Sequence, residues 1–238
     1  MVGFGTLINF VAILAGGIAG LFLGNRFSQR MQDTVNKACG ISVLFIGMAG
    51  AMEGMLSLEN GSLSSGQSLL ITLCLVLGAL VGELINIEGW FERLGEWLKI
   101  KSGNAGDNRF LDGFLTASLT VCIGAMAIVG AIEDGMYGDF SILATKSILD
   151  LILVMIMACS LGVGCVFSAI PVAVLEGGIT ALARLIKPVM TPAALFNLSM
   201  VGSILIFCVG LNLVWGKKVR VANLLPAVVL AVLAAFLP

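Results

Sequence analysis

Residues 4–23 of this chain read FGTLINFVAILAGGIAGLFL, a run of twenty residues without a charged side chain. An α-helix of about twenty apolar residues is long enough to cross the roughly 30 Å hydrocarbon core of a bilayer. The run has no basic segment before it and no cleavage site after it, so we interpret it as a retained first span rather than a signal peptide. Similar runs follow, which predicts an all-α, polytopic bundle of transmembrane helices.

Seven such runs can be drawn along the chain, and we treat residues 1–238 as a single integral membrane domain. The stretch Phe167–Lys187 is ambiguous, because it reads either as a re-entrant element or as an eighth span. We therefore expect about seven spans. The predicted spans are Phe4–Leu23, Ala38–Glu53, Ser68–Ile87, Phe110–Ile132, Ile142–Val166, Ala193–Trp215 and Val221–Leu237.

The composition supports a membrane location and argues against several classes of function. Hydrophobic residues make up 59% of the chain and charged residues 11%, whereas a soluble domain has about 25% charged residues. The net charge of −1 gives no reason to expect a nucleic-acid partner. The chain has no histidine and no metalloprotease, serine hydrolase or phosphate-binding loop motif. We expect no enzyme activity, no catalytic residue, no metal site and no cofactor.

Three segments beside the spans are apolar on one helical face only. In Glu88–Ile100 this face carries Trp90 and Trp97, and the segments Arg26–Ala38 and Leu175–Lys187 have the same pattern. Such helices lie in the membrane interface, with tryptophan at the depth of the headgroups. A short helix packed beneath the bundle would have the same pattern, so both interpretations stay open.

The distribution of Lys and Arg predicts the orientation, because cytoplasmic loops collect these residues. Nine of them follow the first, third and fifth spans, and four lie on the opposite side. This predicts a protein of the cytoplasmic (inner) membrane with its N-terminus outside and its C-terminus in the cytoplasm. The nine are Arg26, Arg30, Lys37, Arg93, Lys99, Lys101, Arg109, Arg184 and Lys187, and the four are Lys146, Lys217, Lys218 and Arg220. An eighth span would move residues 217–220 inside and carry Arg184 and Lys187 outside.

Similar span ends recur at an interval of eighty residues. The second span ends with Gly50–Glu53, the fourth with Gly130–Glu133, and the sixth contains Gly210–Asn212. Small residues four apart recur as well, including Gly16 and Gly20 in the first span. Such spacing lets helix backbones approach closely in a bilayer. We predict an internal two-span repeat and close helix packing at these glycines.

Six carboxylates and amides in the spans are candidates for substrate or ion binding. An ionisable group in hydrocarbon costs roughly 2.5–3.5 kcal/mol or more, so it usually faces a cavity or a partner. The equivalent repeat positions of Glu53, Glu133 and Asn212 suggest a cation or proton site, but the place of the two carboxylates at span ends favours simple solvation among the headgroups. Those deeper in the spans fit either a site or an interhelical hydrogen bond. The candidates are Glu53, Glu133, Asp134, Asp150, Glu176 and Asn212.

Three motifs carry a resemblance to a known family: the opening GTLINFVAILAGGIAGLFLGNR, the span ends GMAGAMEG and GAIEDG, and the amphipathic FERLGEWL. The chain resembles the bacterial membrane proteins grouped as domain of unknown function 554, the YqgA/YdfK-type family. The resemblance covers essentially the whole chain. It implies a polytopic bacterial inner-membrane protein of about this length, and it carries over no site residues.

Two functions are compatible with these features. The first is a secondary transporter or channel for a small solute or ion, in which the acidic residues of the spans bind a coupling ion such as a monovalent cation. The second is a non-transporting scaffold or regulatory subunit that acts through its cytoplasmic amphipathic helices. Under either function the partner surface includes the lipid bilayer, and the small-residue faces would suit a homo-oligomer.

Overall fold

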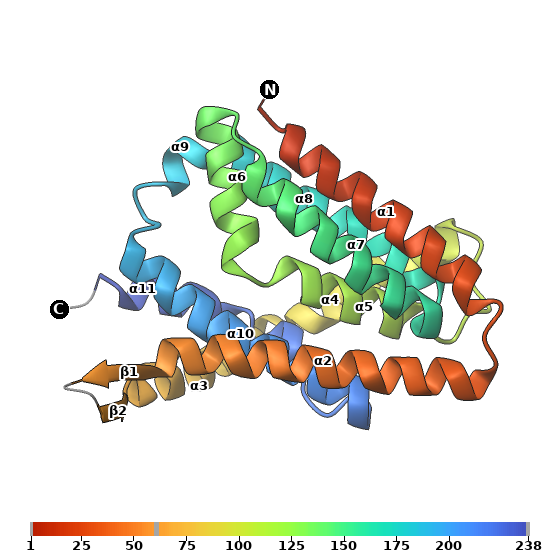
Figure 1. The fold of residues 1–238 in the computed structure, drawn as a ribbon, viewed down its shortest axis with the longest axis horizontal. Coiled ribbons are helices and arrows are strands. Elements are labelled where there is room, and N and C mark those ends of the chain that lie inside the picture. The colour runs from red at the N-terminus through yellow and green to blue at the C-terminus, as the bar shows by residue number, and fades with distance from the viewer. Residues whose placement is uncertain (1, 60–61, 237–238) are drawn as a thin grey trace.

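The computed structural model describes residues 2–59 and 62–236, and most of them lie in helices (Figure 1). Helices α1, α2, α3, α7 and α10 are the long ones, and shorter helices fill the space between them. The helices are α1 (Phe4–Gly24), α2 (Gln29–Met55), α3 (Ser68–Ile85), α4 (Ile87–Lys101), α5 (Phe110–Cys122), α6 (Ala125–Tyr137), α7 (Ser141–Leu161), η1 (Val163–Ser168), α8 (Ala169–Ala181), α9 (Ala183–Ile186), α10 (Pro192–Trp215), η2 (Val221–Leu224) and α11 (Pro226–Ala234).

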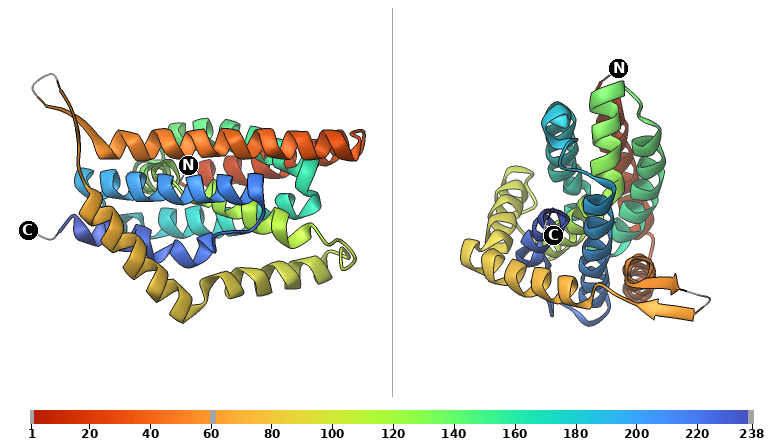
Figure 2. Two further views of the ribbon diagram at one scale, coloured as in Figure 1. Left: turned by 90° about the horizontal axis from the view of Figure 1, so that it is seen from below. Right: turned by 90° about the vertical axis from the view of Figure 1, so that its left-hand side faces the viewer.

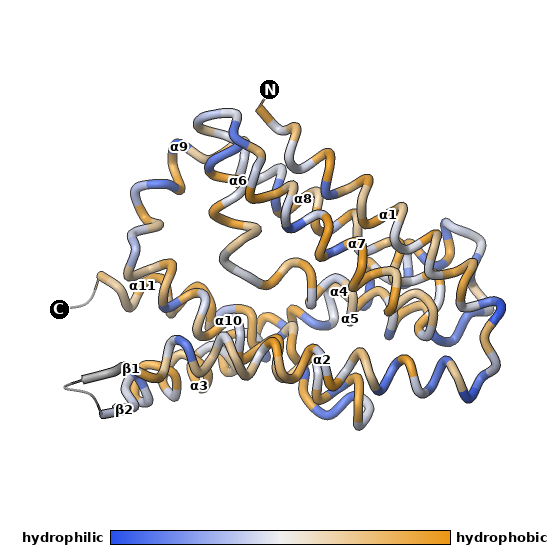
Figure 3. Tube along the Cα trace, viewed as in Figure 1, coloured by the Kyte–Doolittle hydropathy of each residue, from blue (hydrophilic) through white to orange (hydrophobic). Residues whose placement is uncertain are grey.

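The described part of the chain contains six helices that are long and apolar enough to cross a membrane. They are the five long helices and the continuous helical stretch Val163–Ala181, formed by η1 and α8. The bent pair α5–α6 makes a seventh if it is one span. Hydrophobic residues follow the length of these helices, while hydrophilic ones gather where α1 leads into α2 (Figure 3). The predicted all-α, polytopic architecture is confirmed.

The set of spans nevertheless differs from the predicted seven. The ambiguous stretch Phe167–Lys187 largely belongs to the membrane-length helix Val163–Ala181, so the re-entrant alternative does not hold there. The predicted span Phe110–Ile132 is broken near Gly124, and its two parts meet at 62°. The predicted span Val221–Leu237 begins with the short η2 and continues as α11 from Pro226, whose ring suits only the first turn of a helix. Its last residue lies outside the described residues.

Only one of the three amphipathic segments forms a separate helix. Glu88–Ile100 is α4, but Arg26–Ala38 is continuous with the second span as the beginning of α2. The Ser28 side chain caps α2 by accepting a hydrogen bond from the Met31 amide, and no helix-breaking residue follows it. Leu175–Lys187 is divided between α8 and α9. A short antiparallel hairpin, β1 (Leu56–Glu59) with β2 (Ser62–Ser65), follows α2 and was not predicted.

Close packing of glycine-bearing helices holds the bundle together. Helix α1 lies along α7 in parallel, and α2 lies along α10 in the antiparallel sense (Figures 1 and 2). A Cβ atom at Gly16 or Gly20 would collide with the carbonyl oxygens of Leu151 and Met155. The predicted close approach at the small-residue positions is therefore confirmed. The eighty-residue repeat stays a prediction.

The basic residues are divided unequally between the two ends of the bundle. Lys217 pairs with Glu88, with 2.6 Å between Nζ and Oε1, and Arg220 pairs with Glu83, so the loop after α10 lies at the junction of α3 and α4. Arg184 and Lys187 lie at the other end, where Lys187 bonds to the Tyr137 hydroxyl of α6. All remaining Lys and Arg except Lys146 are at the first end, in the loops and helix ends around α2 and α4.

This arrangement changes the predicted topology. The added span carries residues 217–220 to the end of the bundle that holds Arg26 and Arg30, as an eight-span chain would. Helix α11 then returns, and the Ala231 carbonyl accepts a hydrogen bond from Asn197, near the start of α10. The C-terminal end of α11 thus shares an end of the bundle with the start of α1, rather than lying opposite to it as a seven-span topology requires.

Candidate functional site

A cluster of ionisable side chains is buried where α1, α7 and α8 meet the C-terminal end of α5. Lys146 and Asp150 lie one turn apart on α7, and their side chains form an ion pair. The Lys146 Nζ lies 3.7 Å from the Glu176 carboxylate of α8. The exposed fractions are 6% for Lys146, 4% for Asp150 and 0% for Glu176. Burying such charges costs several kcal/mol per ion unless they are paired, so these three groups depend on one another.

Asn9 of α1 connects the two acids. Its Nδ2 atom donates to Asp150 Oδ2 at 3.0 Å and to Glu176 Oε1 at 2.8 Å, and its side chain is completely buried. Three helices that are far apart in the sequence therefore converge on one amide group. The close packing of α1 on α7 through Gly16 and Gly20 holds Asn9 at this depth.

The broken span supplies a backbone acceptor to the same cluster. Lys146 Nζ donates to the Val121 carbonyl at 2.9 Å. Val121 lies in the last turn of α5, where carbonyl groups have no partner within the helix. The break follows at Gly124, which has φ +151° and ψ 149°, a conformation that is open almost only to glycine. The break in the helix thus leaves free a carbonyl oxygen that would accept a hydrogen bond within a continuous helix.

A second polar layer lies between the cluster and the start of α1. Thr6 of α1 and Thr180 of α8 face each other with 3.5 Å between their hydroxyl oxygens, and each lies about one turn from the cluster. Asp134 of α6 accepts from the Gly3 and Gly5 amides at 3.2 and 3.0 Å. Its carboxylate therefore caps the positive N-terminal end of α1.

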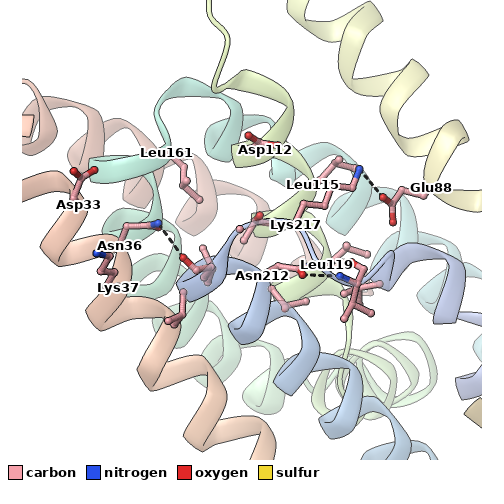
Figure 4. A pocket seen from close by; sticks show the side chains of 17 residues that line it. Asp33, Asn36, Lys37, Glu88, Asp112, Leu115, Leu119, Leu161, Asn212 and Lys217 are labelled. Carbon is pink, nitrogen blue, oxygen red and sulfur yellow. Dashed lines mark hydrogen bonds and ion pairs between the residues drawn. The ribbon is translucent and has the colours of Figure 1, made fainter.

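A cavity of about 380 Å³ opens at the end of the bundle that is rich in Lys and Arg. Figure 4 shows side chains from α2, α5 and α10 gathered around it, with Asp33 and Lys37 of α2 on one side and Asp112, Leu115 and Leu119 of α5 across from them. Lys217 closes one side through its pairs with Glu88 and Glu92. Burial lowers the pKa of Lys217, but its hydrogen bonds to these two acids outweigh burial and raise the pKa above its ordinary value.

The structure separates the six predicted site residues. Asp150 and Glu176 belong to the buried cluster, and Asp134 lies in the second polar layer. Glu133 is half-buried beside Asp134, and Glu53 is exposed near the end of α2. Asn212 lines the cavity, where its side chain bonds to the backbone of Lys218 and Val219. The idea that Glu53, Glu133 and Asn212 form one site through the repeat is untested.

Sequence reasoning missed Lys146 as a partner of the acids: the predicted span Ile142–Val166 contains it, but it was counted only among the basic residues that predict the orientation. The residue lies in the second turn of α7, because this helix begins at Ser141 and contains both Lys146 and Asp150. The spacing of four residues between a lysine and an acid in an apolar run was the available signal. Asn9, which joins the two acids, is also not among the predicted site residues.

Comparison with known proteins gives a family and two similar relatives. The family described as "Protein of unknown function (DUF554)" matches residues 4–236. The chain is 30% identical over 231 residues to "Uncharacterized protein YqgA" of Escherichia coli (strain K12), covering 95% of this chain and 94% of that protein. It is 28% identical over 233 residues to "Uncharacterized membrane protein YdfK" of Bacillus subtilis (strain 168), covering 98% and 96%. No solved structure matches the chain.

Proposed function

The chain belongs to the DUF554 family, and we propose that it is a secondary transporter that couples the movement of a small solute to an ion bound in the Lys146–Asp150–Glu176 cluster. The observation that carries the proposal is the position of this cluster. Its lysine bonds to a carbonyl at the end of a broken helix, deep among spans. Broken helices with free carbonyl groups beside buried charges are typical of ion and substrate sites in transporters.

A purely structural role explains the cluster poorly. Replacing a buried ion pair by apolar side chains is often neutral or stabilising, so such a pair contributes little to stability. Here two acids face one lysine, which leaves the group unbalanced in charge. Ionisable residues inside a membrane usually mark a pathway for an ion or a proton.

The cavity supports the solute half of the proposal. Thr116 and Leu119 of α5 line it, and the Val121 carbonyl of the same helix accepts from Lys146. With a rise of about 1.5 Å per residue, only about 3 Å along the helix axis separates Leu119 from Val121. Helix α5 therefore links the cavity wall to the ionic cluster, so a shift of α5 would change the shape of the cavity and the position of the Val121 carbonyl in the cluster.

The basic end of the bundle is the cytoplasmic end in this proposal. Arg184 and Lys187 are the two basic residues at the other end, while the loops around α2 and α4 carry most of the rest. This asymmetry is the one that cytoplasmic loops have in bacterial inner-membrane proteins. The cavity then opens to the cytoplasm, and both the start of α1 and the end of α11 face outward.

Charge movement across liposomes containing the purified protein tests the proposal. Ion and pH jumps would be combined with a panel of amino acids, nucleobases and carboxylates. We expect a solute-dependent current in the wild type and its loss in the Asp150→Asn and Glu176→Gln variants. Glu96→Gln is the matched control, because it makes the same change at an exposed carboxylate of α4, and it should keep the current. Folded protein that stays silent across the panel would contradict transport.

One observation favours the alternative, a scaffold or regulatory subunit. Helix α4 packs Leu98 against Phe110 and Phe114, yet it leaves Trp90 and Trp97 exposed, at 66% and 56%. Large aromatic residues on an amphipathic helix suit a membrane interface or a protein partner. Under this function Trp90→Ala and Trp97→Ala would abolish activity in cells, while Asp150→Asn and Glu176→Gln would be tolerated. A homo-oligomer fits either function.

A further inference from the structure

The buried cluster lacks one positive charge. Lys146 supplies a single positive charge, while Asp150 and Glu176 together carry two negative charges when both are ionised. Among the described residues, Lys146 alone of the Lys and Arg lies within ion-pair distance of these two acids. The other groups close to them in the described structure are Asn9 of α1 and the Cys122 thiol at the end of α5, while Thr6 and Thr180 lie about one turn away. Asp134 of α6 is the next acid outward and adds no positive charge.

Two buried oxygen atoms in the cluster have no hydrogen-bond partner among the described residues. They are Glu176 Oε2 and Asn9 Oδ1. Both side chains have an exposed fraction of 0%, so neither atom is solvated from outside the protein. A buried polar atom without a partner costs about 1–3 kcal/mol. Two such atoms in adjacent groups indicate that the site is built for something that pairs both.

The geometry suggests what that is. Asn9 Nδ2 already donates to Glu176 Oε1 at 2.8 Å. The two unpaired oxygens, Asn9 Oδ1 and Glu176 Oε2, therefore belong to an amide and a carboxyl group that are already hydrogen-bonded to each other. A carboxylic acid and a primary amide can form two hydrogen bonds at once, with the acid donating to the amide oxygen. One hydrogen atom on Oε2 would therefore satisfy both oxygens.

We propose that Glu176 binds one proton on Oε2 and donates it to Asn9 Oδ1, so that the proton is the coupling ion of the cluster. Uptake changes the summed charge of Lys146, Asp150 and Glu176 from −1 to zero, and release restores −1. The proposal rests on the function proposed above and specifies its ion.

A metal cation fits the cluster less well than a proton. Metal cations with oxygen ligands need several at once, for example about 6–8 around Ca²⁺. Only two unpaired oxygens are present here, and no group of three metal-binding side chains occurs among the described residues. The Lys146 ammonium group, 3.7 Å from Glu176, would also repel a second cation.

A route for the proton leads toward the start of α1. Thr6 lies three residues before Asn9, and Thr180 lies four residues after Glu176, so both hydroxyls are about one helical turn away on the same faces. Hydroxyl groups both donate and accept, which lets them relay a proton. Asp134 lies at the outer end of this line.

Infrared difference spectroscopy of the reconstituted protein tests the proposal without any transport. The signal is the C=O stretching band of a protonated carboxylic acid, followed through a pH jump and in heavy water. We expect a band at neutral pH that disappears at alkaline pH. It should be absent from Glu176→Gln, kept in the control Glu96→Gln, and shifted in Asn9→Ala, which removes the acceptor. The wild-type band and its isotope shift keep the test valid if a variant fails to fold.

Two outcomes would overturn the proposal. The first is a band that is missing, or that survives in folded Glu176→Gln. The second is thermal stability that rises with NaCl but not with choline chloride while the band is absent, which would identify the ligand as sodium. The proposal and the proposed function can also fail separately. A band without flux would support the proton site and contradict transport, whereas flux without the band would contradict the proton site alone.

Discussion

Replacing Lys146 by Met is the change that tests the cluster most directly. Met has nearly the length of the lysine stem and is apolar, so the substitution removes the charge and leaves little cavity. It removes the cation that pairs with Asp150 among the described residues and frees the Val121 carbonyl. Breaking a buried ion pair by removing one partner costs about 3–5 kcal/mol. We therefore expect Lys146→Met to lose about that much unfolding free energy.

The double variant Lys146→Met, Asp150→Asn separates charge from packing. With both members neutral, the buried unpaired charge is gone, and replacing a whole buried pair is often close to neutral. We expect the double variant to recover most of the loss, to within roughly 1–2 kcal/mol of the wild type. Asp150→Asn alone should be milder than Lys146→Met, because Lys146 can still pair with Glu176.

Unfolding in mixed micelles, titrated with a denaturing detergent and followed by circular dichroism, measures these differences. Lys37→Met is the matched control, since it makes the same change at an exposed position near the start of α2. A loss below about 1 kcal/mol in Lys146→Met, similar to that of a surface residue, would refute the buried pair. A double variant no more stable than Lys146→Met would show that packing, not charge, governs the site.

Two further predictions concern the bundle. Gly20→Ala should destabilise the protein by about 1–3 kcal/mol, because its Cβ would meet the Met155 carbonyl. Gly178→Ala, with open space around its Cβ, should stabilise the protein by up to about 1 kcal/mol. Thermal unfolding of both variants checks this contrast, and equal effects would contradict the close packing. A thiol reagent that cannot cross membranes should label the Lys187→Cys variant from outside intact cells and the Lys217→Cys variant only in inverted vesicles. Labelling of the wild type gives the background, and the reverse pattern would contradict the proposed orientation.

Most of the fold could be predicted from the sequence where a helix is uniformly apolar. Phe4–Leu23 and Ala193–Trp215 match α1 and α10 to within a residue at each end, because length and hydropathy alone define such spans. The stretch after Gly162 was harder, because Glu176 interrupts its apolar run. That carboxylate lies 3.7 Å from the Nζ atom of Lys146, thirty residues earlier, and a pairing of this kind is set by tertiary contact.

Contacts between residues that are far apart in the sequence also limited the prediction of the site. Lys146 lies within the predicted span Ile142–Val166, but its charge was used only to predict the orientation, so Asp150 and Glu176 were considered singly. Asp150 could be identified from its depth in an apolar helix. Its connection to Asn9 depends on α1 packing in register with α7, which no pattern within either segment specifies.

The division of the cluster between rigid and separable elements indicates how an ion could be coupled to movement. Asn9, Lys146 and Asp150 belong to α1 and α7, whose backbones are in contact at Gly16 and Gly20 and cannot easily slide. Glu176 belongs to α8, where a Cβ atom at Gly177 would meet only the Thr6 side chain of α1, at 3.9 Å, rather than a backbone atom. A charged Glu176 attracts Lys146 across this seam, whereas a protonated Glu176 carries no charge and adds a second hydrogen bond to the one it already accepts from Asn9. Protonation therefore changes the attraction between α8 and the α1–α7 pair while the pair itself stays fixed, which is the kind of bias that a two-state transporter requires.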